Sequence, residues 1–427
     1  MPCLRGGGLR GCVHRARAYA RDGVKAVWEV KFRGYVYRAG EYMEQLQIAA
    51  PCHFGMEAVL KREIYDLGYE ISRVEDGRVV FEGDYEALAY ANIHLRTPER
   101  ILLVVAEFEA RSWEELFQGI RGIAWENYLP KDAKFWVTKA TSVKSELFST
   151  RDIQSIVKRA MVERMSKIYG ISHFPETGAE YPLRIFIMKN RVMVTLDSTG
   201  LPLHKRGYRT LTSKAPLSET LAAGLLMLTP WHADRILMDP FCGSGTILIE
   251  AAMMAANIAP GLDRSFTGEQ WTNLIDPQVW RDLRADARGQ INPDVRTNLQ
   301  GYDLDPRMVE IARQNARRAG VADLIHFQQR DVRDTSHPKK YGFILTNPPY
   351  GERLEDQKDL PELYAAIGRA YRSLDDWSMY IITSYEDAQK YLGRKADKNR
   401  KIYNGMIKTY FYQYLGPKPP RRKKQEN

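Results

Sequence analysis

Two consecutive prolines in the turn Thr346-Asn347-Pro348-Pro349-Tyr350-Gly351 constrain this chain more than any other feature. The turn follows the apolar run 341–345, which predicts a buried strand that ends where the prolines fix φ and remove two N–H donors. An NH2 group on a planar base can donate one hydrogen to Asn347 and one to the Pro348 carbonyl, while Tyr350 stacks on the base. The candidate catalytic residues are therefore Asn347, Pro348, Pro349 and Tyr350, although a simple Pro-Pro turn explains the tetrapeptide alone equally well.

A second motif, Asp-Pro-Phe-Cys-Gly-Ser-Gly-Thr at 239–246, joins the apolar segment 235–238 to a helical segment at 247–256. Strand, glycine loop and helix in this order are typical of nucleotide-binding folds. The loop has neither the G-x-G-x-x-G spacing nor a lysine after its last glycine, so a ligand without phosphate fits better. S-adenosylmethionine (SAM) is such a ligand, because two glycines let its methionine portion approach the backbone and the helix N-terminus attracts its carboxylate. The candidate cofactor contacts here are Asp239, Phe241, Gly243, Ser244, Gly245 and Thr246.

Two acidic residues after later strands extend this candidate site. Asp303 ends the predicted strand 299–303, a position from which a carboxylate can accept both ribose hydroxyls. Asp331 follows the predicted strand 325–328, where it could bind an adenine amino group or serve as a turn carboxylate. Asp305 needs no ligand, since an N-cap followed by Pro306 at the first helical position accounts for it.

Strands and helices alternate through the second half of the chain and end in a hairpin around Asn404-Gly405. This order predicts an α/β fold, a doubly wound sheet whose last strand is antiparallel. Residues 257–297 interrupt the alternation, and we interpret them as an insertion over the site or a helical cover.

The first half, 43–200, predicts a small α+β region with a basic helix at 149–167. Its residues Arg151, Lys158 and Arg159 form either a contact face for RNA phosphates or a solvated helix face, the commoner meaning of such charges. The basic segment 203–209 follows and can grip a phosphate or serve as a solvated linker. Its candidate RNA-binding residues are Lys205, Arg206 and Arg209.

The formal net charge of +10 is concentrated at the two ends of the 427-residue chain. Residues 1–42 carry a net charge of +6 and residues 418–427 carry +4, so the body from 43 to 417 is formally neutral. We expect the first 42 residues to be a disordered basic arm or a non-native extension before a natural start at Met43. The basic tail either adds nonspecific RNA affinity or is only a soluble end.

Composition excludes several classes of protein. No stretch approaches 18 uninterrupted apolar residues, and the N-terminus lacks the apolar core of a signal peptide, so we expect a cytoplasmic protein. The four cysteines, Cys3, Cys12, Cys52 and Cys242, have no C-x-x-C spacing, which predicts free thiols and no metal site.

The series Asp-Pro-Phe-Cys-Gly-Ser-Gly-Thr, Gly-Tyr-Asp-Leu-Asp-Pro and Thr-Asn-Pro-Pro-Tyr-Gly-Glu-Arg-Leu resembles the amino-group methyltransferases of the Rossmann type. With the segment 204–209 and the insertion, the chain looks like the bacterial family of THUMP-domain RNA methyltransferases, whose best-known members make N2-methylguanosine in large-subunit ribosomal RNA. The resemblance implies a ferredoxin-like part at 43–110, an RNA-binding THUMP domain at 111–200, and a SAM-dependent methyltransferase domain with a seven-stranded sheet at 201–417. The implied partner is RNA.

Several alternatives stay open at this point. Guanine N2, adenine N6 and glutamine amide nitrogens all present similar NH2 groups, so the motif indicates the type of atom and not the base. A tRNA guanine-N2 methyltransferase, a DNA adenine-N6 methyltransferase and a non-catalytic RNA-binding assembly factor are the competing readings.

Overall fold

The computed structural model describes residues 45–209, 217–351, 358–374, 376–405 and 407–420, together with three strands nearer the N-terminus. These strands are β1 (Arg17–Tyr19), β2 (Val27–Phe32) and β3 (Tyr35–Arg38), which pair antiparallel within a separate unit, 1–45. The expectation of a disordered basic arm or a non-native extension before Met43 stays a prediction. The other residues of this stretch, Cys3 and Cys12 among them, and the tail from 421 lie outside the described residues.

Residues from Leu46 begin with a ferredoxin-like β-α-β-β-α-β unit. Its sheet order, β5-β6-β4-β7, places strands distant in sequence side by side, and every pair in it is antiparallel. The elements are β4 (Leu46–Pro51), α1 (Glu57–Asp66), β5 (Ile71–Glu75), β6 (Arg78–Gly83), α2 (Tyr85–His94) and β7 (Leu102–Glu109).

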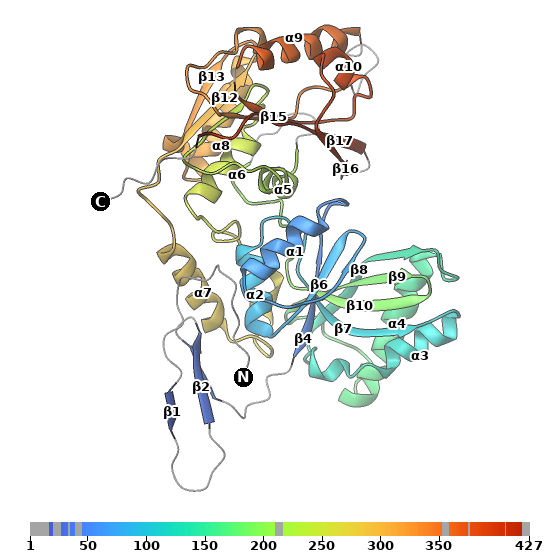
Figure 1. Ribbon diagram of the computed structural model, residues 1–427. Helices are drawn as coiled ribbons and strands as arrows, with labels where there is room; N and C mark the ends of the chain where they lie inside the picture. Colours follow the sequence, from blue (N-terminus) through green and yellow to red (C-terminus); the bar gives the residue numbers. More distant parts are fainter. Residues whose placement is uncertain are drawn as a thin grey trace. The chain divides into compact units, whose positions relative to one another are not determined.

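The next segment continues the same sheet, because β10 pairs antiparallel with β7 (Figure 1). The seven-stranded order is β5-β6-β4-β7-β10-β9-β8, so the ferredoxin-like part and the segment after it share one sheet. Lys189 and Asn190 both have positive φ, which suits the two-residue turn between β9 and β10. The elements are α3 (Trp113–Gly122), η1 (Trp125–Asn127), β8 (Lys134–Val143), α4 (Thr150–Tyr169), β9 (Glu180–Met188) and β10 (Arg191–Asp197).

The second half forms another seven-stranded sheet, with the order β13-β12-β11-β14-β15-β17-β16. Strands β11 to β15 are parallel, and β17 pairs antiparallel with β15, which confirms the predicted doubly wound α/β fold. The strands are β11 (Ile236–Asp239), β12 (Asn298–Asp303), β13 (Ile325–Gln329), β14 (Phe343–Thr346), β15 (Ser378–Thr383), β16 (Lys398–Asn404) and β17 (Ile407–Tyr414).

Helices cover both faces of this sheet (Figure 1). Successive side chains of β11 point to opposite faces of the sheet. Leu237 packs in the core with residues of α6 and α8, and Met238 packs in the core with residues of α9 and α10. The helices are α5 (Glu219–Met227), α6 (Thr246–Ala255), α8 (Pro306–Arg318), η3 (Ala322–Leu324), η4 (Val332–Asp334), α9 (Leu360–Arg372) and α10 (Ala388–Leu392). No helix in the described ranges is long and apolar enough to cross a membrane.

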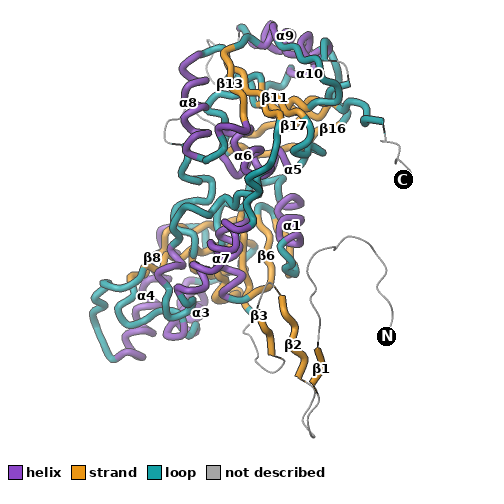
Figure 2. The backbone as a smooth tube through the Cα atoms, turned by 90° about the vertical axis from the view of Figure 1, so that its left-hand side faces the viewer, coloured by secondary structure: helices purple, strands orange, loops and turns teal. Residues whose placement is uncertain are grey.

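The insertion does not cover the site, and this part of our interpretation is wrong. Its elements η2 (Thr267–Gln270) and α7 (Pro277–Gly289) contact the first half of the chain, η2 against β9 and α7 against α2. Figure 2 shows α7 beside the first sheet. Trp271 stacks on Tyr181 at 5.3 Å between ring centroids, and its Nε1 donates to the Glu180 carbonyl at 2.8 Å. The insertion therefore links the second half of the chain to the first half.

Candidate active site

The proline turn and the glycine loop meet at the carboxyl edge of the second sheet. Thr346, the last residue of β14, donates its hydroxyl hydrogen to Asp239 Oδ1 at 2.7 Å, and Asp239 is the last residue of the neighbouring β11. Both side chains are buried. This bond fixes the start of the turn relative to the start of the loop.

Asp239 is buried as a carboxyl group without a cationic partner among the described residues. Burial raises its pKa to about 7, although hydrogen bonds from Thr346 and from the Phe241 backbone N–H oppose the shift. Negative charge on Asp303 contributes to the same rise. Near neutral pH this carboxyl group therefore exists in both protonation states.

Asp303 ties the glycine loop to β12. Its Oδ2 accepts from the Gly243 backbone N–H at 3.0 Å, and its Oδ1 accepts from the Asp305 N–H at 2.9 Å. Burial raises the pKa of Asp303, while these two backbone bonds oppose the shift. The carboxylate is thus held rigidly, with its remaining lone pairs available to a ligand.

The two glycines of the loop have different roles. Gly243 has φ +51°, and a Cβ built on it would meet no atom within 4 Å, so its backbone is open to a ligand. Gly245 has φ +84°, and a Cβ there would lie 3.0 Å from Phe327 and 3.1 Å from Ala312. Gly245 thus serves helix–sheet packing and is not among the residues that line the cavity, and its contact with the cofactor stays a prediction.

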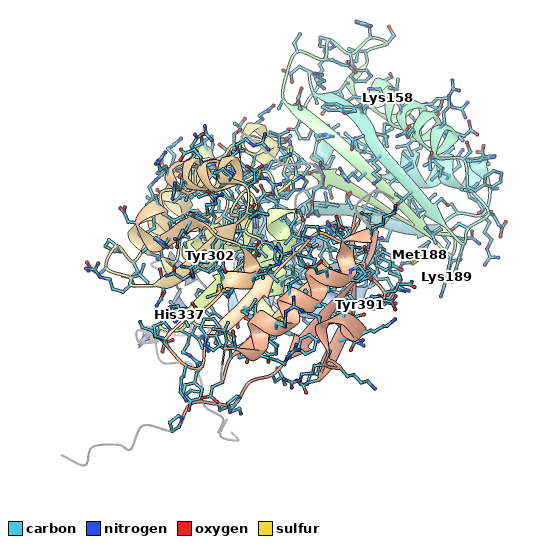
Figure 3. All side chains as sticks on the ribbon, turned by 90° about the horizontal axis from the view of Figure 1, so that it is seen from above. Lys158, Met188, Lys189, Tyr302, His337 and Tyr391 are labelled. Atoms are coloured by element: carbon cyan, nitrogen blue, oxygen red, sulfur yellow. The ribbon has the colours of Figure 1, made fainter. Side chains whose placement is uncertain are left out.

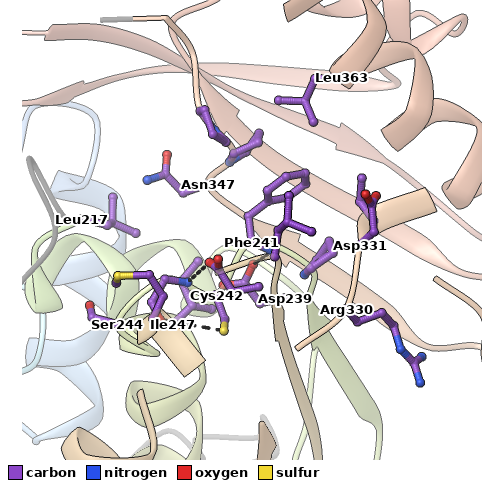
Figure 4. A pocket seen from close by; sticks show the side chains of 18 of the residues that line it. Leu217, Asp239, Phe241, Cys242, Ser244, Ile247, Arg330, Asp331, Asn347 and Leu363 are labelled. Atoms are coloured by element: carbon purple, nitrogen blue, oxygen red, sulfur yellow. Dashed lines mark hydrogen bonds between the residues drawn. The ribbon is translucent and has the colours of Figure 1, made fainter. Parts of the chain in front are cut away.

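The motifs share one cavity of about 530 Å³, within the range of small-molecule sites (Figure 4). Arg330 turns its guanidinium away from the cavity and onto the Tyr302 ring, 4.5 Å from the centroid. The predicted residues that line the cavity are Asp239, Phe241, Gly243, Ser244, Thr246, Asp303, Asp331, Asn347, Pro348, Pro349 and Tyr350.

A chain of hydrogen bonds from α9 and β15 holds the Pro349 carbonyl of the turn. Tyr364 Oη lies 3.3 Å from the Pro349 carbonyl oxygen, which can only accept, so the tyrosine donates. Thr383 Oγ1, 2.5 Å from Tyr364, must then donate to the tyrosine, and it accepts from the Tyr385 backbone N–H at 3.0 Å. Sequence reasoning missed Tyr364, because nothing in a helical tyrosine indicates which distant carbonyl it meets.

Three family models match the chain in succession. The RlmL ferredoxin-like domain matches residues 47–102, the THUMP domain matches 110–197, and the RMKL-like methyltransferase domain matches 206–413. YpsC of Bacillus subtilis (strain 168), provisionally named an RNA methyltransferase, is 46% identical over 387 residues, which cover 90% of this chain and 100% of YpsC. The chain belongs to the bacterial family of THUMP-domain RNA methyltransferases.

Further comparisons agree on this family. The ribosomal RNA large subunit methyltransferase K/L of Psychromonas ingrahamii (strain DSM 17664 / CCUG 51855 / 37) is 35% identical over 385 residues, 87% of this chain and 50% of that protein. The structure of SMU.472, provisionally named a methyltransferase and complexed with SAH, has a TM-score of 0.83 and 42% identity over 88% of this chain and 100% of that chain. A structure from Listeria monocytogenes str. 4b F2365, described as a predicted N6-adenine-specific DNA methylase, has a TM-score of 0.82 and 46% identity over 88% of this chain and 97% of that chain.

SAM is the cofactor of this THUMP-domain methyltransferase, and the cavity fits it. Asp239, Asp303 and Asp331 give the cavity acidic character, while Arg333 is paired with Asp331 at 3.1 Å. A cavity of this charge suits a cationic sulfonium and neutral ribose hydroxyls better than a phosphate. Asp331 also caps η4 through the Arg333 backbone N–H at 2.8 Å, so the turn role left open above is present.

The Cys242 thiol is not poised to act as a nucleophile. Burial raises the pKa of the Cys242 thiol well above its usual range, so the thiol is neutral. Cys52 and Cys242 are free thiols. Within the described residues, no group of three or more His, Cys, Asp or Glu side chains is arranged to hold a metal ion.

Sequence reasoning also missed the apolar wall of the cavity. Leu217, Met308 and Leu363 lie on it, each just before a helix or in a helix's first turn. Met308 and Leu363 follow β12 and β14, whose carboxyl ends form the site, so their place after a strand was the available signal. Leu217 precedes β11 and carried no such signal.

The six candidate RNA-binding residues fall into two groups. Arg151 and Lys205 are exposed, whereas Lys158 is ion-paired with Glu176 at 3.0 Å and Arg159 lies over the Phe117 ring (Figure 3 shows Lys158 on α4). These four remain candidates.

Arg206 and Arg209 do not remain candidates. The Arg206 side chain is 1% exposed and pairs with the buried Glu250 at 3.5 Å, and the Arg209 side chain is 6% exposed and pairs with Glu219 at 3.1 Å. Neither guanidinium can reach an RNA phosphate from these positions, so both predictions are wrong, and the two arginines instead anchor the linker to α5 and α6.

Proposed function

We propose that this protein transfers a methyl group from SAM to an exocyclic amino group of RNA, guanine N2 of large-subunit (23S) ribosomal RNA. The observation that carries the proposal is the shared cavity, in which the amide of Asn347 lies at the same edge as the glycine loop and Asp303. The residues for a cofactor and the acceptor for an NH2 group thus line the same cavity. Methyl transfer to nitrogen requires this combination.

The chain's residues act on the target nitrogen by position and hydrogen bonding. The lone pair of an exocyclic NH2 group is delocalised into the base, so the nitrogen is a poor nucleophile at rest. Asn347 Oδ1 and the Pro348 carbonyl would accept its two hydrogens, while the Pro349 carbonyl is already held by Tyr364. Tyr350 would stack on a base taken out of its helix or presented in a loop.

SAM supplies the electrophilic methyl group on its sulfonium. The C–N bond would form as the S–C bond breaks, the neutral thioether would leave, and the nitrogen would release one proton. No covalent intermediate with the enzyme is required, in agreement with a neutral, buried Cys242.

Two findings support ribosomal RNA as the substrate. A THUMP model matches residues 110–197, and the Psychromonas relative is named a large-subunit ribosomal RNA methyltransferase. The choice of guanine N2 as the methylated atom depends on the resemblance to the family's best-known members. The Listeria protein is described as an N6-adenine-specific DNA methylase, and adenine N6 in DNA is the second candidate.

Nucleoside analysis separates these candidates. Purified protein is incubated with radiolabelled SAM and ribosomal RNA, tRNA or DNA from a strain that lacks the gene, and the digested nucleosides are separated by chromatography. We expect label in N2-methylguanosine from large-subunit RNA. Label in tRNA would keep the chemistry and change the substrate, and label in N6-methyladenine of DNA would refute the proposal. Absence of SAM binding by calorimetry would favour a non-catalytic assembly factor.

A further inference from the structure

The terminal hairpin presents alternating lysine and tyrosine side chains on one face. In the β16–β17 register, Lys401 is opposite Tyr410 and Tyr403 is opposite Lys408. Because side chains alternate along a strand, these four share a face, which we call the hairpin surface. The other face carries Ile402, which is fully buried in the core.

The lysines of the hairpin surface lie over aromatic rings and remain exposed. Lys401 Nζ is 5.2 Å from the Tyr403 centroid, and Lys408 Nζ is 5.0 Å from the Tyr410 centroid. Among the described residues, no carboxylate lies within ion-pair distance of either lysine. Their charge is therefore available to an anionic partner, in contrast to Lys158, which is already paired with Glu176.

Aromatic residues from other elements extend the hairpin surface. Phe54, which precedes α1 and is 53% exposed, meets Tyr403 edge to face at 6.1 Å between centroids. On α10, Tyr391 stacks on Tyr385 at 6.1 Å and carries Lys390 over its ring at 5.0 Å (Figure 3 labels Tyr391).

The hairpin surface lies at the edge of the sheet that holds the catalytic turn. Thr383, the last residue of β15, pairs with Tyr410, so the hairpin tip projects beyond the carboxyl end of β15. Tyr385 follows β15 and lies 5.0 Å from the ring of Tyr364, which holds the Pro349 carbonyl. Tyr385 and Tyr391 thus form an aromatic pair beside the residue that supports the turn, at the same end of β15 as the hairpin tip.

We propose that the hairpin surface binds the single-stranded RNA that flanks the target nucleotide. This inference rests on the proposed function, since it takes RNA as the substrate. A base taken out of its helix leaves neighbours unstacked, and partly exposed rings interleaved with exposed lysines bind unstacked bases and their phosphates with little sequence preference. The alternative is that these lysine–tyrosine pairs only stabilise an edge hairpin. In that case their removal would not weaken RNA binding.

The test compares paired variants by fluorescence anisotropy with a labelled single-stranded RNA of about 12 nucleotides, a length within the range of such sites. The variant Lys401→Ala/Lys408→Ala should bind this RNA about tenfold more weakly, and its slope of log K against log salt should be smaller by about 1.4, since each phosphate contact contributes about 0.7 on single strands. Tyr403→Leu/Tyr410→Leu should weaken binding at least about fivefold without changing that slope.

The control is Lys339→Ala/Lys340→Ala, which removes two exposed lysines just before the central strand β14, at the amino end of the strands and so at the end opposite the catalytic turn. Lys340 pairs with Asp376 at 3.3 Å. This variant should bind RNA like the wild type, and all three variants should keep wild-type SAM affinity by calorimetry, which also verifies folding. Wild-type affinity in both hairpin variants, or an equal loss in the control, would overturn the inference. So would failure of the wild type to bind the RNA.

Failure of the proposed function would look different. If the nucleoside assay placed the label in DNA, the proposed function would fall while the anisotropy result still decided whether the hairpin surface binds RNA. If the wild type methylated large-subunit RNA and the hairpin variants kept its KM, the inference would fall and the function would stand.

Discussion

Asp303 illustrates how far a single residue can be interpreted from its neighbours. Its place at the end of a strand predicted a contact with ribose, and the structure places it on the cavity with one oxygen on the Gly243 N–H and the other on the Asp305 N–H. By contrast, the burial of Arg206 and Arg209 could not be predicted, because it depends on Glu250 and Glu219, whose helices the linker meets only in the folded chain.

Replacement of Asp303 by alanine should weaken SAM binding roughly tenfold or more, because hydrogen bonds to a charged acceptor are lost. The matched control is Asp305→Ala, since that carboxylate only caps α8 and pairs with the exposed Arg307. Calorimetric titration of both variants measures the effect. An unchanged dissociation constant for Asp303→Ala would contradict the ribose assignment.

Asp239 should make the stability of the cofactor-free protein depend on pH. Its folded pKa of about 7 lies above the ordinary range near 4, so its contribution to folding is complete below about pH 4 and is lost as the pH rises through 7. Asp239→Asn cannot ionise and keeps an oxygen that accepts from Thr346. Urea unfolding of the wild type should therefore show a larger fall in stability from about pH 5 to pH 8 than unfolding of this variant. Parallel pH profiles would show that Asp239 does not titrate in the folded state.

At the scale of elements, the strand–loop–helix units were predictable because each carries its own signal. The Asn404-Gly405 turn predicted the terminal hairpin, and the Pro306 start predicted α8. The destination of α7 was not predictable, because an amphipathic helix shows which face is buried and not which element buries it. The stretch around Trp271 packs on Tyr181 from the first sheet, a contact with no trace in local sequence.

Helix α9 supports the catalytic turn through Tyr364, and Tyr364→Phe tests this support. Removal of the hydroxyl frees the Pro349 carbonyl, so kcat should fall about tenfold, with SAM affinity unchanged and stability lower by about 1 kcal/mol. Tyr371→Phe is the matched control, since it removes a comparable bond to the Trp377 carbonyl from the same helix. Equal kcat values in the two variants would show that Tyr364 does not position the turn.

At the scale of the whole molecule, polar contacts join the N-terminal half to the catalytic half. Glu99 accepts from His204 Nδ1 at 2.7 Å and contacts His53 Nε2 at 3.2 Å, and Thr220 donates to it. Burial alone would raise the pKa of Glu99, but the hydrogen bonds from His204, His53 and Thr220 hold it well below its usual range. The catalytic half is thus attached through a junction that requires an ionised carboxylate.

Glu99→Gln should therefore lower the free energy of unfolding by about 1–3 kcal/mol at neutral pH. Because the folded pKa is depressed, the wild type has this contribution above about pH 4 and loses it in more acidic solution, so the two proteins should converge there. Glu310→Gln, in an exposed ion pair on α8, should cost less than about 1 kcal/mol. A wild-type advantage that persists unchanged at low pH would contradict the assignment.

The central claim is that one turn holds the amino group of an RNA base while the adjoining loop holds SAM. The most direct test measures methyl transfer from labelled SAM to large-subunit RNA by the wild type and by Asn347→Ala, with SAM affinity measured in parallel. We predict that label in N2-methylguanosine falls at least about 100-fold in the variant, while the SAM dissociation constant stays within a fewfold. Equal transfer by the two proteins would show that Asn347 does not hold the target nitrogen and would contradict the account.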